Sequence, residues 1–408
     1  MNAAGAASPA ATAPRTPPKV RRPVPAPRVS SPVVARLAAD LDAGVPGALA
    51  AFWSGRVSPV IEPDGDGWIV TFLWRDAEAD EALLFVNRLT DERDLGRSLM
   101  DRLPGTDLWH LAYRMPGDWR ASYSFLPKRP ARPAPWRDLA EQVSLRAVLD
   151  RGLADPLNPR TMRNRIGNRM SVVELPDAPS QAWLAPRGPQ RGVLTEHELD
   201  GRRPWVYRPA EFVPGGPVLV ALDGEMWLGE QSLPAMVDNL IADGLLRAPL
   251  LLLVPGGDRL HRWAELNGAG SMPHWIADVL LPWAVTTHGA GPDAADRVVA
   301  GQSLGGAVAL LAAAERPDAV GGFISQSASL WQEGLLDRIA AAMPPGARGH
   351  LEVGRQEWVL LGPNRELHRR LDEAGVRHRY AEFNGGHDYA CWRGGIADGL
   401  IATLAPRG

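Results

Sequence analysis

A Gly-x-Ser-x-Gly turn at residues 301–305 constrains the fold of this chain more than any other segment. A short β-branched run, Val298-Val299, leads into the turn, and an alanine-rich run at 307–314 follows it. A strand, a sharp turn and a helix in this order form a nucleophile elbow, which lifts a serine hydroxyl above a sheet. The alternative is an ordinary glycine-rich turn with an incidental serine. Ser303 is therefore a candidate nucleophile that requires a base, an acid and oxyanion donors elsewhere in the chain.

The length and composition limit the classes of protein to consider. A chain of 408 residues is long for one hydrophobic core, so we expect two domains. The net charge of −3 argues against a general nucleic-acid-binding protein. The single cysteine, Cys391, excludes an internal disulfide framework, and no apolar run reaches the roughly 18 residues of a membrane span. We expect a cytoplasmic protein.

The first 32 residues are rich in Ala, Pro and Arg and contain no acidic residue. They also lack the apolar stretch of a secretory signal. We therefore interpret residues 1–32 as a disordered basic tail.

The next part of the chain has the pattern of an all-β domain. After helical spacing at 32–44 and 46–53, runs rich in aromatic and branched residues are separated by turn residues, at 67–75, 81–87, 107–113 and 119–125. This pattern predicts an antiparallel β-sandwich. We assign residues 33–171, with a proline-rich and turn-rich linker at their end, to this domain. Acids, bases and nucleophiles do not cluster there, so we expect a binding or supporting role.

From residue 172 onward, predicted strands and helices alternate. Apolar runs at 218–222 and 250–255 are typical of strands buried on both faces, and helices are expected at 233–242 and 275–284. Beyond the elbow, strands at 320–325, 351–353 and 380–383 alternate with helices at 334–342, 364–374 and 394–404. Such alternation predicts a mostly parallel sheet flanked by helices. With the elbow, it indicates an α/β-hydrolase fold for residues 172–408.

The base and the acid should follow the serine in the order serine, acid, histidine. Four histidines follow Ser303 in the sequence: His350, His368, His378 and His387. His387 is the predicted base because it lies on a glycine loop directly after the last predicted strand. Glu357, on the loop after the preceding strand, is the predicted acid, which orients the imidazole and stabilises its charged form. Glu352, inside that strand, is the alternative.

Two backbone groups are candidate oxyanion donors. The N–H of Leu304 follows the nucleophile directly, as the elbow requires. The second donor should follow the strand 218–222, where Asp223-Gly224-Glu225 permits a turn, so we predict the N–H of Glu225. Asp223 itself is a candidate structural residue of that loop. We find no compact His, Cys or carboxylate cluster with metal-ligand spacing, so we expect no protein-bound metal and no cofactor.

At this point the chain resembles the enterochelin (ferric enterobactin) esterase family. The matching stretches include Ala-Leu-Asp-Gly-Glu-Met-Trp at 221–227 and Val-Ala-Gly-Gln-Ser-Leu-Gly-Gly at 299–306. The most specific one is Gly-Gly-His-Asp-Tyr-Ala-Cys-Trp-Arg-Gly-Gly at 385–395, and 72–75, 105–110 and 155–159 match the family's N-terminal domain. The resemblance covers about residues 35–408. It implies hydrolysis of the ester (trilactone) bonds of a ferric catecholate siderophore, such as ferric enterobactin, with release of iron in the cytoplasm. It also implies that Ser303, Glu357 and His387 form the triad and that iron enters only as part of the substrate.

A ferric tris-catecholate is a bulky trianion with aromatic edges, so its site should offer cations and flat apolar surfaces. The predicted binding residues, all on or beside the catalytic loops, are Arg262, Arg393, Trp227 and Trp392. Structural roles in ion pairs or in the core are the alternative for each. Two other functions are compatible with the sequence: a different serine acyl enzyme, such as a feruloyl-type esterase or an acyltransferase, and a non-catalytic siderophore- or carbohydrate-binding protein.

Overall fold

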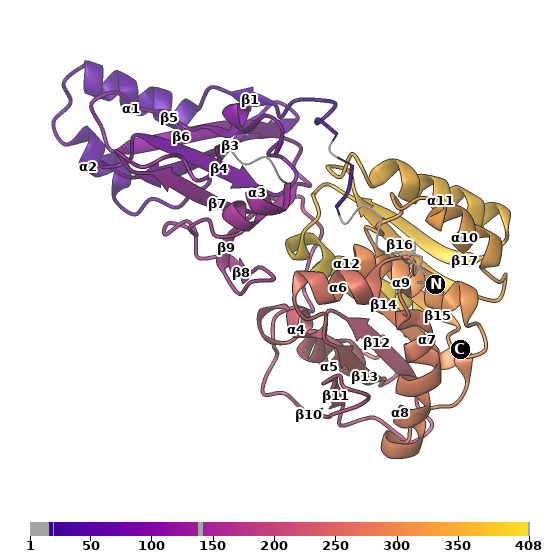
Figure 1. The fold of residues 1–408 in the computed structure, drawn as a ribbon. Coiled ribbons are helices and arrows are strands. Elements are labelled where there is room, and N and C mark those ends of the chain that lie inside the picture. The colour runs from indigo at the N-terminus through magenta and orange to yellow at the C-terminus, as the bar shows by residue number, and fades with distance from the viewer. Residues whose placement is uncertain (1–15, 19, 138–141, 407–408) are drawn as a thin grey trace, which may run out of the picture.

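The computed structural model describes residues 16–18, 20–137 and 142–406, which form two lobes. The N-terminal lobe contains two antiparallel sheets, and the C-terminal lobe contains one mostly parallel sheet between helices (Figure 1). The predicted fold class, an α/β-hydrolase domain preceded by antiparallel β-sheets, is confirmed.

The two N-terminal sheets face each other across a shared core. The first has the order β1(Arg28–Val29)-β6(Leu108–Met115)-β3(Gly67–Arg75)-β2(Val60–Asp64), with β5(Asp101–Arg102) also paired to β6. The second has the order β4(Glu81–Val86)-β7(Arg120–Lys128)-β9(Arg169–Glu174)-β8(Thr161–Arg163). Between them, the rings of Phe72 and Tyr123 meet edge-on with centroids 4.8 Å apart. The described part of the lobe also contains the helical segments α1(Pro32–Asp42), α2(Ala48–Trp53), η2(Leu95–Ser98) and α3(Gln142–Leu149).

Two predicted boundaries of the N-terminal domain are wrong. Strand β1 lies within the predicted disordered tail, yet its two residues pair with Tyr113 and Ala112 of β6, because a free sheet edge there offers backbone partners. Residues 1–15 and 19 of that tail lie outside the described residues. The predicted boundary at 172 falls inside β9, which pairs with β7. The strand-like run at 172 is real, but it closes the first lobe and does not open the second.

The C-terminal sheet carries the site. Its order is β10(Val193–Glu196)-β11(Trp205–Arg208)-β13(Leu250–Val254)-β12(Val218–Leu222)-β14(Arg297–Gln302)-β15(Gly322–Gln326)-β16(Arg348–Gly354)-β17(Arg377–Phe383). The strands from β12 to β17 run parallel, while β10 and β11 are antiparallel. These two short strands were not predicted from the sequence. All four residues of β10 are exposed, so no apolar alternation marks it.

Helices cover both faces of this sheet, because alternate residues of each strand point to opposite sides. Val218 and Val220 face a core formed with α6(Arg259–Leu266), α7(Met272–Trp275), α8(Leu281–His288), α9(Leu304–Glu315), α10(Leu335–Ala342) and α11(Leu361–Glu373). Leu219 and Ala221 face the second core, with α5(Leu233–Ala242) and α12(Tyr389–Leu404). The shorter segments are α4(Gly224–Trp227), η3(Gly229–Gln231), η4(Ile276–Leu280) and η5(Ala294–Asp296). The helix predicted at 275–284 is interrupted by a π-helical turn, η4, just before Pro282, which has no N–H for a regular helix.

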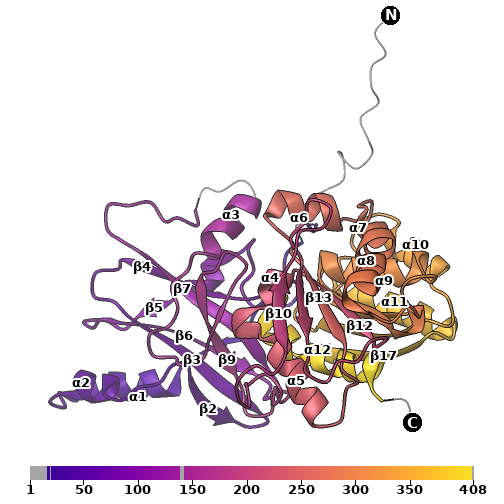
Figure 2. The ribbon, with the colours of Figure 1, turned by 90° about the horizontal axis from the view of Figure 1, so that it is seen from below.

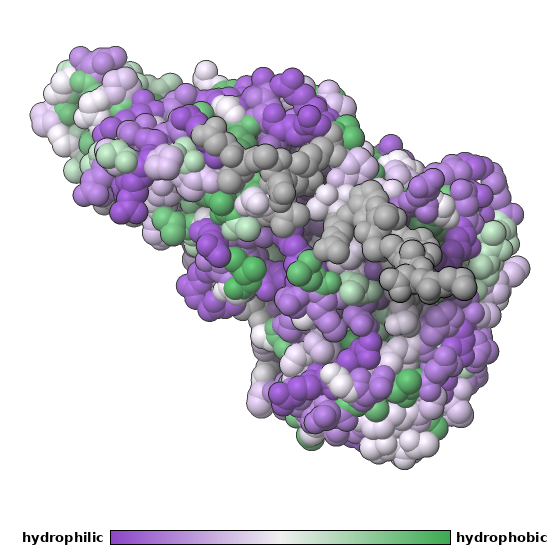
Figure 3. All heavy atoms as spheres, viewed as in Figure 1, coloured by the Kyte–Doolittle hydropathy of each residue, from purple (hydrophilic) through white to green (hydrophobic). Residues whose placement is uncertain are grey.

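The two lobes pack against each other. Phe85 and Val172 of the first lobe belong to the same buried cluster as Trp392 and Ile396 of α12. Figure 2 shows α3 of the first lobe beside α6 of the second, where the guanidinium of Arg259 lies 3.9 Å from the carboxylate of Asp150. The outer face seen in Figure 3 is mainly hydrophilic, with small separated apolar spots. No helix within the described ranges is long and apolar enough to cross a membrane.

Candidate active site

Ser303 occupies a strained turn between β14 and α9. Its backbone angles are φ 61° and ψ −116°, in a region that residues with a side chain rarely adopt. Such a conformation costs about 1–3 kcal/mol and persists only when the surroundings impose it. Here the turn is too tight for a side chain at Gly301, because a methyl group there would lie 2.3 Å from the carbonyl of Gly305. The local sequence thus produces the elbow geometry expected for a nucleophile.

His387 and Glu357 form a direct pair. The Nδ1 atom of His387 lies 2.5 Å from Oε2 of Glu357. The other carboxylate oxygen of Glu357 accepts hydrogen bonds from the hydroxyl of Ser327 at 2.5 Å and from the N–H of Gly354 at 2.9 Å. Glu357 is 1% exposed, so these three donors of the protein replace water around its carboxylate. Its orientation is therefore set from both sides.

The charges of this pair suit a base and its orienting acid. Burial alone would raise the pKa of Glu357, but His387, Ser327 and Arg88 together hold it below its usual value. The carboxylate is therefore ionised at neutral pH. Burial lowers the pKa of His387 and outweighs the opposite effect of Glu357. The imidazole is therefore neutral at pH 7, and its 21% exposed side chain is able to accept a proton.

The alternative acid, Glu352, is engaged elsewhere. It lies inside β16 and is 3% exposed. Its carboxylate accepts a hydrogen bond from Gln326 at 2.6 Å and lies 3.2 Å from Nε2 of His350. These contacts keep it within the sheet, so the geometry favours Glu357 as the acid.

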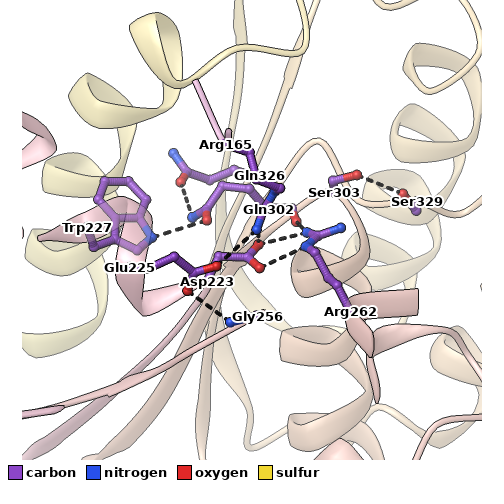
Figure 4. Close-up of polar contacts among 10 residues, drawn as sticks. All are labelled: Arg165, Asp223, Glu225, Trp227, Gly256, Arg262, Gln302, Ser303, Gln326 and Ser329. Atoms are coloured by element: carbon purple, nitrogen blue, oxygen red, sulfur yellow. Dashed lines mark hydrogen bonds and ion pairs between the residues drawn. The ribbon is translucent and has the colours of Figure 1, made fainter. Parts of the chain in front are cut away.

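The hydroxyl of Ser303 contacts another serine. Its Oγ lies 3.1 Å from Oγ of Ser329, and the two side chains point toward each other in Figure 4. Among the described residues, no hydrogen bond joins Ser303 to His387. Catalytic hydrogen bonds are often long in enzymes without substrate and tighten when the substrate binds. Rotation of the serine side chain alone redirects its hydroxyl, so this arrangement is compatible with a serine–histidine pair.

The two predicted oxyanion donors lie at the same edge of the sheet. Strands β12 and β14 are parallel neighbours, with Ala221 opposite Ala300, so the turns that follow them are adjacent. Leu304 is the first residue of α9 and Glu225 the second of α4, positions whose N–H groups have no acceptor within the helix. The Glu225 side chain braces the loop, since its carboxylate accepts a hydrogen bond from the N–H of Gly256 at 2.9 Å.

Asp223 holds these two turns together. It has a positive φ of 56°, and its buried carboxylate receives two hydrogen bonds of 2.7 Å from Arg262 and lies 3.0 Å from Arg165 (Figure 4). Burial would raise the pKa of Asp223, but the two arginines hold it far below its usual value. Arg262 also donates to the carbonyl of Gln302, next to the nucleophile, at 3.2 Å. Asp223 therefore has the contacts of a structural residue of this loop, as its position in the sequence suggested.

The residues predicted to bind substrate mostly serve the protein's own structure. The guanidinium of Arg262 is committed to Asp223, and its side chain is 12% exposed. Arg393 donates to the side chain of Gln181 at 2.9 Å, and burial lowers its pKa. Neither guanidinium contacts Ser303, Glu357 or His387 within the part of the chain that is described.

The two tryptophans that were predicted to contact substrate are both buried in the fold. Trp227 is fully buried and donates to the side chain of Gln302 at 3.2 Å. Trp392 is 3% exposed, donates to Ser327 at 2.9 Å, and places its ring edge-on to His387, with centroids 4.7 Å apart. Large aromatic rings fill the core of this lobe, and Trp392 supports the Glu357–His387 pair from behind.

Sequence reasoning missed two residues that support the histidine. Ser327 bridges Trp392 and Glu357, and its place in Ser-Gln-Ser at 325–327, after β15, was the available signal. Asn87 of the N-terminal lobe donates to the backbone carbonyl of His387 at 2.9 Å. No local pattern marks Asn87, because its partner lies 300 residues away in the sequence.

Comparisons with known proteins agree with this architecture. The model of the family "Enterochelin esterase, N-terminal" matches residues 69–184, and that of "Putative esterase" matches residues 202–403. The chain is 31% identical over 387 residues to the iron(III) enterobactin esterase of Escherichia coli (strain K12), covering 87% of this chain and 96% of that protein. It is 33% identical over 402 residues to the iron(III) salmochelin esterase of Escherichia coli O6:H1, covering 90% and 96%.

Two solved structures are similar over nearly the same range. The ferric enterobactin esterase of Salmonella typhimurium superimposes with a TM-score of 0.77 at 28% identity, covering 87% of this chain and 98% of that one. The enterobactin esterase of Shigella flexneri, crystallised in the presence of enterobactin, gives a TM-score of 0.73 at 27% identity, covering 86% and 97%.

Proposed function

Because this chain belongs to the enterochelin esterase family and is a carboxylic-ester hydrolase, we propose that it cleaves the ester bonds of a ferric catecholate siderophore, such as ferric enterobactin. The observation that carries the proposal is the contact between His387 and Glu357 at the sheet edge where the strained elbow presents Ser303. In this proposal the iron enters the site as part of the siderophore substrate. It is released in the cytoplasm when the siderophore is cleaved.

The proposed reaction is acyl transfer through Ser303. The hydroxyl oxygen attacks the ester carbonyl while Nε2 of His387 takes its proton, and Glu357 stabilises the resulting imidazolium. The N–H groups of Leu304 and Glu225 stabilise the negative oxygen of the tetrahedral intermediate. His387 then protonates the departing alkoxide, and the acyl group stays on Ser303. Water, deprotonated by His387, attacks this ester, the bond to Oγ of Ser303 breaks with release of the carboxylic acid, and His387 returns the proton to Oγ.

Charge near the histidine suits an anionic substrate. Two arginines of the N-terminal lobe, Arg88 and Arg146, both act to lower the pKa of His387, which means that they place positive potential at the base. Arg146 is paired with Asp150 at 2.8 Å. For Arg88, the Nε atom is buried without a hydrogen-bond partner among the described residues. Glu357 offsets this positive charge at the histidine itself, so we propose Arg88 and Arg146, in place of Arg262, as the cations that an anionic substrate approaches beside the catalytic pair.

The test uses purified full-length protein with ferric enterobactin, iron-free enterobactin and a neutral aryl ester, with linear products followed by mass spectrometry. We expect linear catecholoyl-serine products from enterobactin at a higher kcat/KM than for the aryl ester. Hydrolysis restricted to the aryl ester would reject the siderophore as substrate.

A second arm tests the nucleophile. Ser303→Ala should lower kcat by several orders of magnitude, since triads that lose their serine lose up to about 10⁶-fold. The matched control is Ser329→Ala, which removes a neighbouring hydroxyl that makes one hydrogen bond to Ser303 and should cost less than about tenfold. Equal activity of Ser303→Ala and the wild type would remove Ser303 from the reaction.

A further inference from the structure

Far from the proposed active site, two histidines and an aspartate converge between α11 and β17. His368 and Asp372 lie one turn apart on α11, and His378 is the second residue of β17. The described residues contain one group of three His, Cys, Asp or Glu side chains with ligand atoms within 4.8 Å of one another, and it is this one. The sequence analysis expected no such cluster, because a turn and a change of element separate its members along the chain.

The separations suit a small metal ion. Nδ1 of His368 lies 2.8 Å from Nε2 of His378, and Asp372 oxygens lie 3.6 Å from Nε2 of His368 and 3.7 Å from Nε2 of His378. Ligand atoms bound to tetrahedral Zn²⁺ at about 2.0–2.1 Å are roughly 3.3 Å apart. Two of these distances use different ring nitrogens of His368, and an ion binds only one of them. With one ligand atom taken from each residue, all three atoms lie within 4.8 Å of one another, so closure around an ion requires side-chain movements of up to about 1.5 Å.

The ring of His378 is already oriented as a ligand, and that of His368 is held beside it. Nδ1 of His378 donates to the carbonyl of Val376 at 2.9 Å, which leaves its Nε2 without a hydrogen and aimed at the cluster. Metal-binding histidines usually donate their other ring N–H in this way. His368 stacks on Tyr380, with ring centroids 4.1 Å apart and an interplanar angle of 9°. The His378 side chain is fully buried, so both rings are held by packing.

Lone pairs outnumber protons in this cluster. A neutral His368 has one ring proton, on Nδ1, which it donates to Nε2 of His378. Its other nitrogen, Nε2, then carries a lone pair that faces the lone pairs of the Asp372 carboxylate. Asp372 has no arginine partner in the described part of the chain. The neighbouring arginines pair elsewhere, Arg369 with Glu366 and Arg370 with Asp337. A cation bound by one nitrogen of His368, by Nε2 of His378 and by Asp372 would remove this excess of lone pairs.

We propose that His368, Asp372 and His378 bind one divalent transition-metal ion. Two imidazole nitrogens and one carboxylate oxygen favour Zn²⁺ or Co²⁺, with water in the open position. The ion would join the last turn of α11 to the start of β17. His387 follows the other end of β17, about 20 Å along the strand, so the role is stabilisation of the fold and not ester hydrolysis. This proposal is independent of the proposed siderophore substrate.

The experiment titrates metal-free, full-length protein with Co²⁺ and follows its visible absorption, then displaces Co²⁺ with Zn²⁺. We expect one site per chain, and affinity at least about tenfold weaker in His368→Ala and in Asp372→Asn. Asp372 is 59% exposed, so Asp372→Asn is the variant that keeps the fold if His368→Ala does not. The matched control is His274→Ala, an exposed histidine outside the cluster, which should bind as the wild type does.

Two readouts besides absorption complete the test. Zn²⁺ should raise the Tm of the wild type and of His274→Ala but not of Asp372→Asn, and it should leave aryl-ester hydrolysis unchanged. Binding of equal affinity in the wild type and Asp372→Asn overturns the proposal, and so does the absence of Co²⁺ absorption. The latter result would assign the cluster to a proton shared by His368 and its two neighbours.

Discussion

Replacement of Glu357 by glutamine should remove most of the activity, because it moves the ring proton of His387 from Nδ1 to Nε2. One carboxylate oxygen of Glu357 accepts two hydrogen bonds, from Ser327 and from the N–H of Gly354. In Glu357→Gln the amide oxygen must keep this position, because an NH₂ group there would face two donors. The amide NH₂ is then directed at Nδ1 of His387, which has to accept a hydrogen bond. The proton consequently moves to Nε2, the atom that should take the proton from Ser303.

The size of the effect follows from this tautomer. In a Ser-His-Asp protease, the equivalent Asp-to-Asn change lowers kcat by about 10⁴, which corresponds to about 5.4 kcal/mol in the activation free energy. We expect a loss of this order in kcat for Glu357→Gln, measured on a neutral aryl ester so that substrate charge plays no part. The free energy of unfolding should change by only about 1 kcal/mol, because one hydrogen bond changes its donor.

The matched control is Glu352→Gln, a similarly buried carboxylate two residues before the end of β16. Its amide oxygen keeps the hydrogen bond from Gln326, and its NH₂ faces His350. The Nδ1 of His350 has no partner among the described residues and is able to take the ring proton. Activity should therefore stay within about tenfold of the wild type. If Glu352→Gln loses more activity than Glu357→Gln, the acid has been assigned wrongly. If both variants keep full activity, the reaction depends on a serine–histidine dyad.

Three further outcomes test the site. The kcat/KM for a neutral ester should fall only below about pH 6.5, because the neutral imidazole is the active form and burial lowers the pKa of His387. An inflection above that pH would contradict the assignment of His387 as the base. Asp223→Asn should lower the free energy of unfolding by about 3–5 kcal/mol in urea titrations, because two partly buried arginines lose their anion; an unchanged midpoint would show that the cluster is not structural. Gly386→Ala should reduce activity, because its methyl group would lie 2.6 Å from Cβ of Arg88 and displace the histidine loop, whereas Gly362→Ala, with nothing within 4 Å, should not.

Several features of the fold are local enough to be read from the sequence. The helix predicted at 233–242 is α5, with the same bounds, because its apolar spacing and its early proline are properties of adjacent residues. The alternation of apolar strands and helices predicted a mostly parallel sheet with helices on both faces. The Gly-x-Ser-x-Gly pattern predicted a tight turn, and a side chain at Gly301 would not fit in it. The order of Ser303, Glu357 and His387 along these elements followed from the same pattern.

Partners of charged and aromatic side chains are decided by packing between distant segments. Arg262 looked available for an anion, yet the folded chain brings it onto Asp223, and Trp227 and Trp392 are core residues and not binding surfaces. The same folding brings Asn87 of the first lobe to His387. Sequence periodicity records which residues are buried but not which residues meet. The sequence by itself therefore determined the elbow and the order of the catalytic candidates. Only the tertiary structure decided which charged side chains are free to bind a ligand, because the residues that neutralise the others lie far away in the chain.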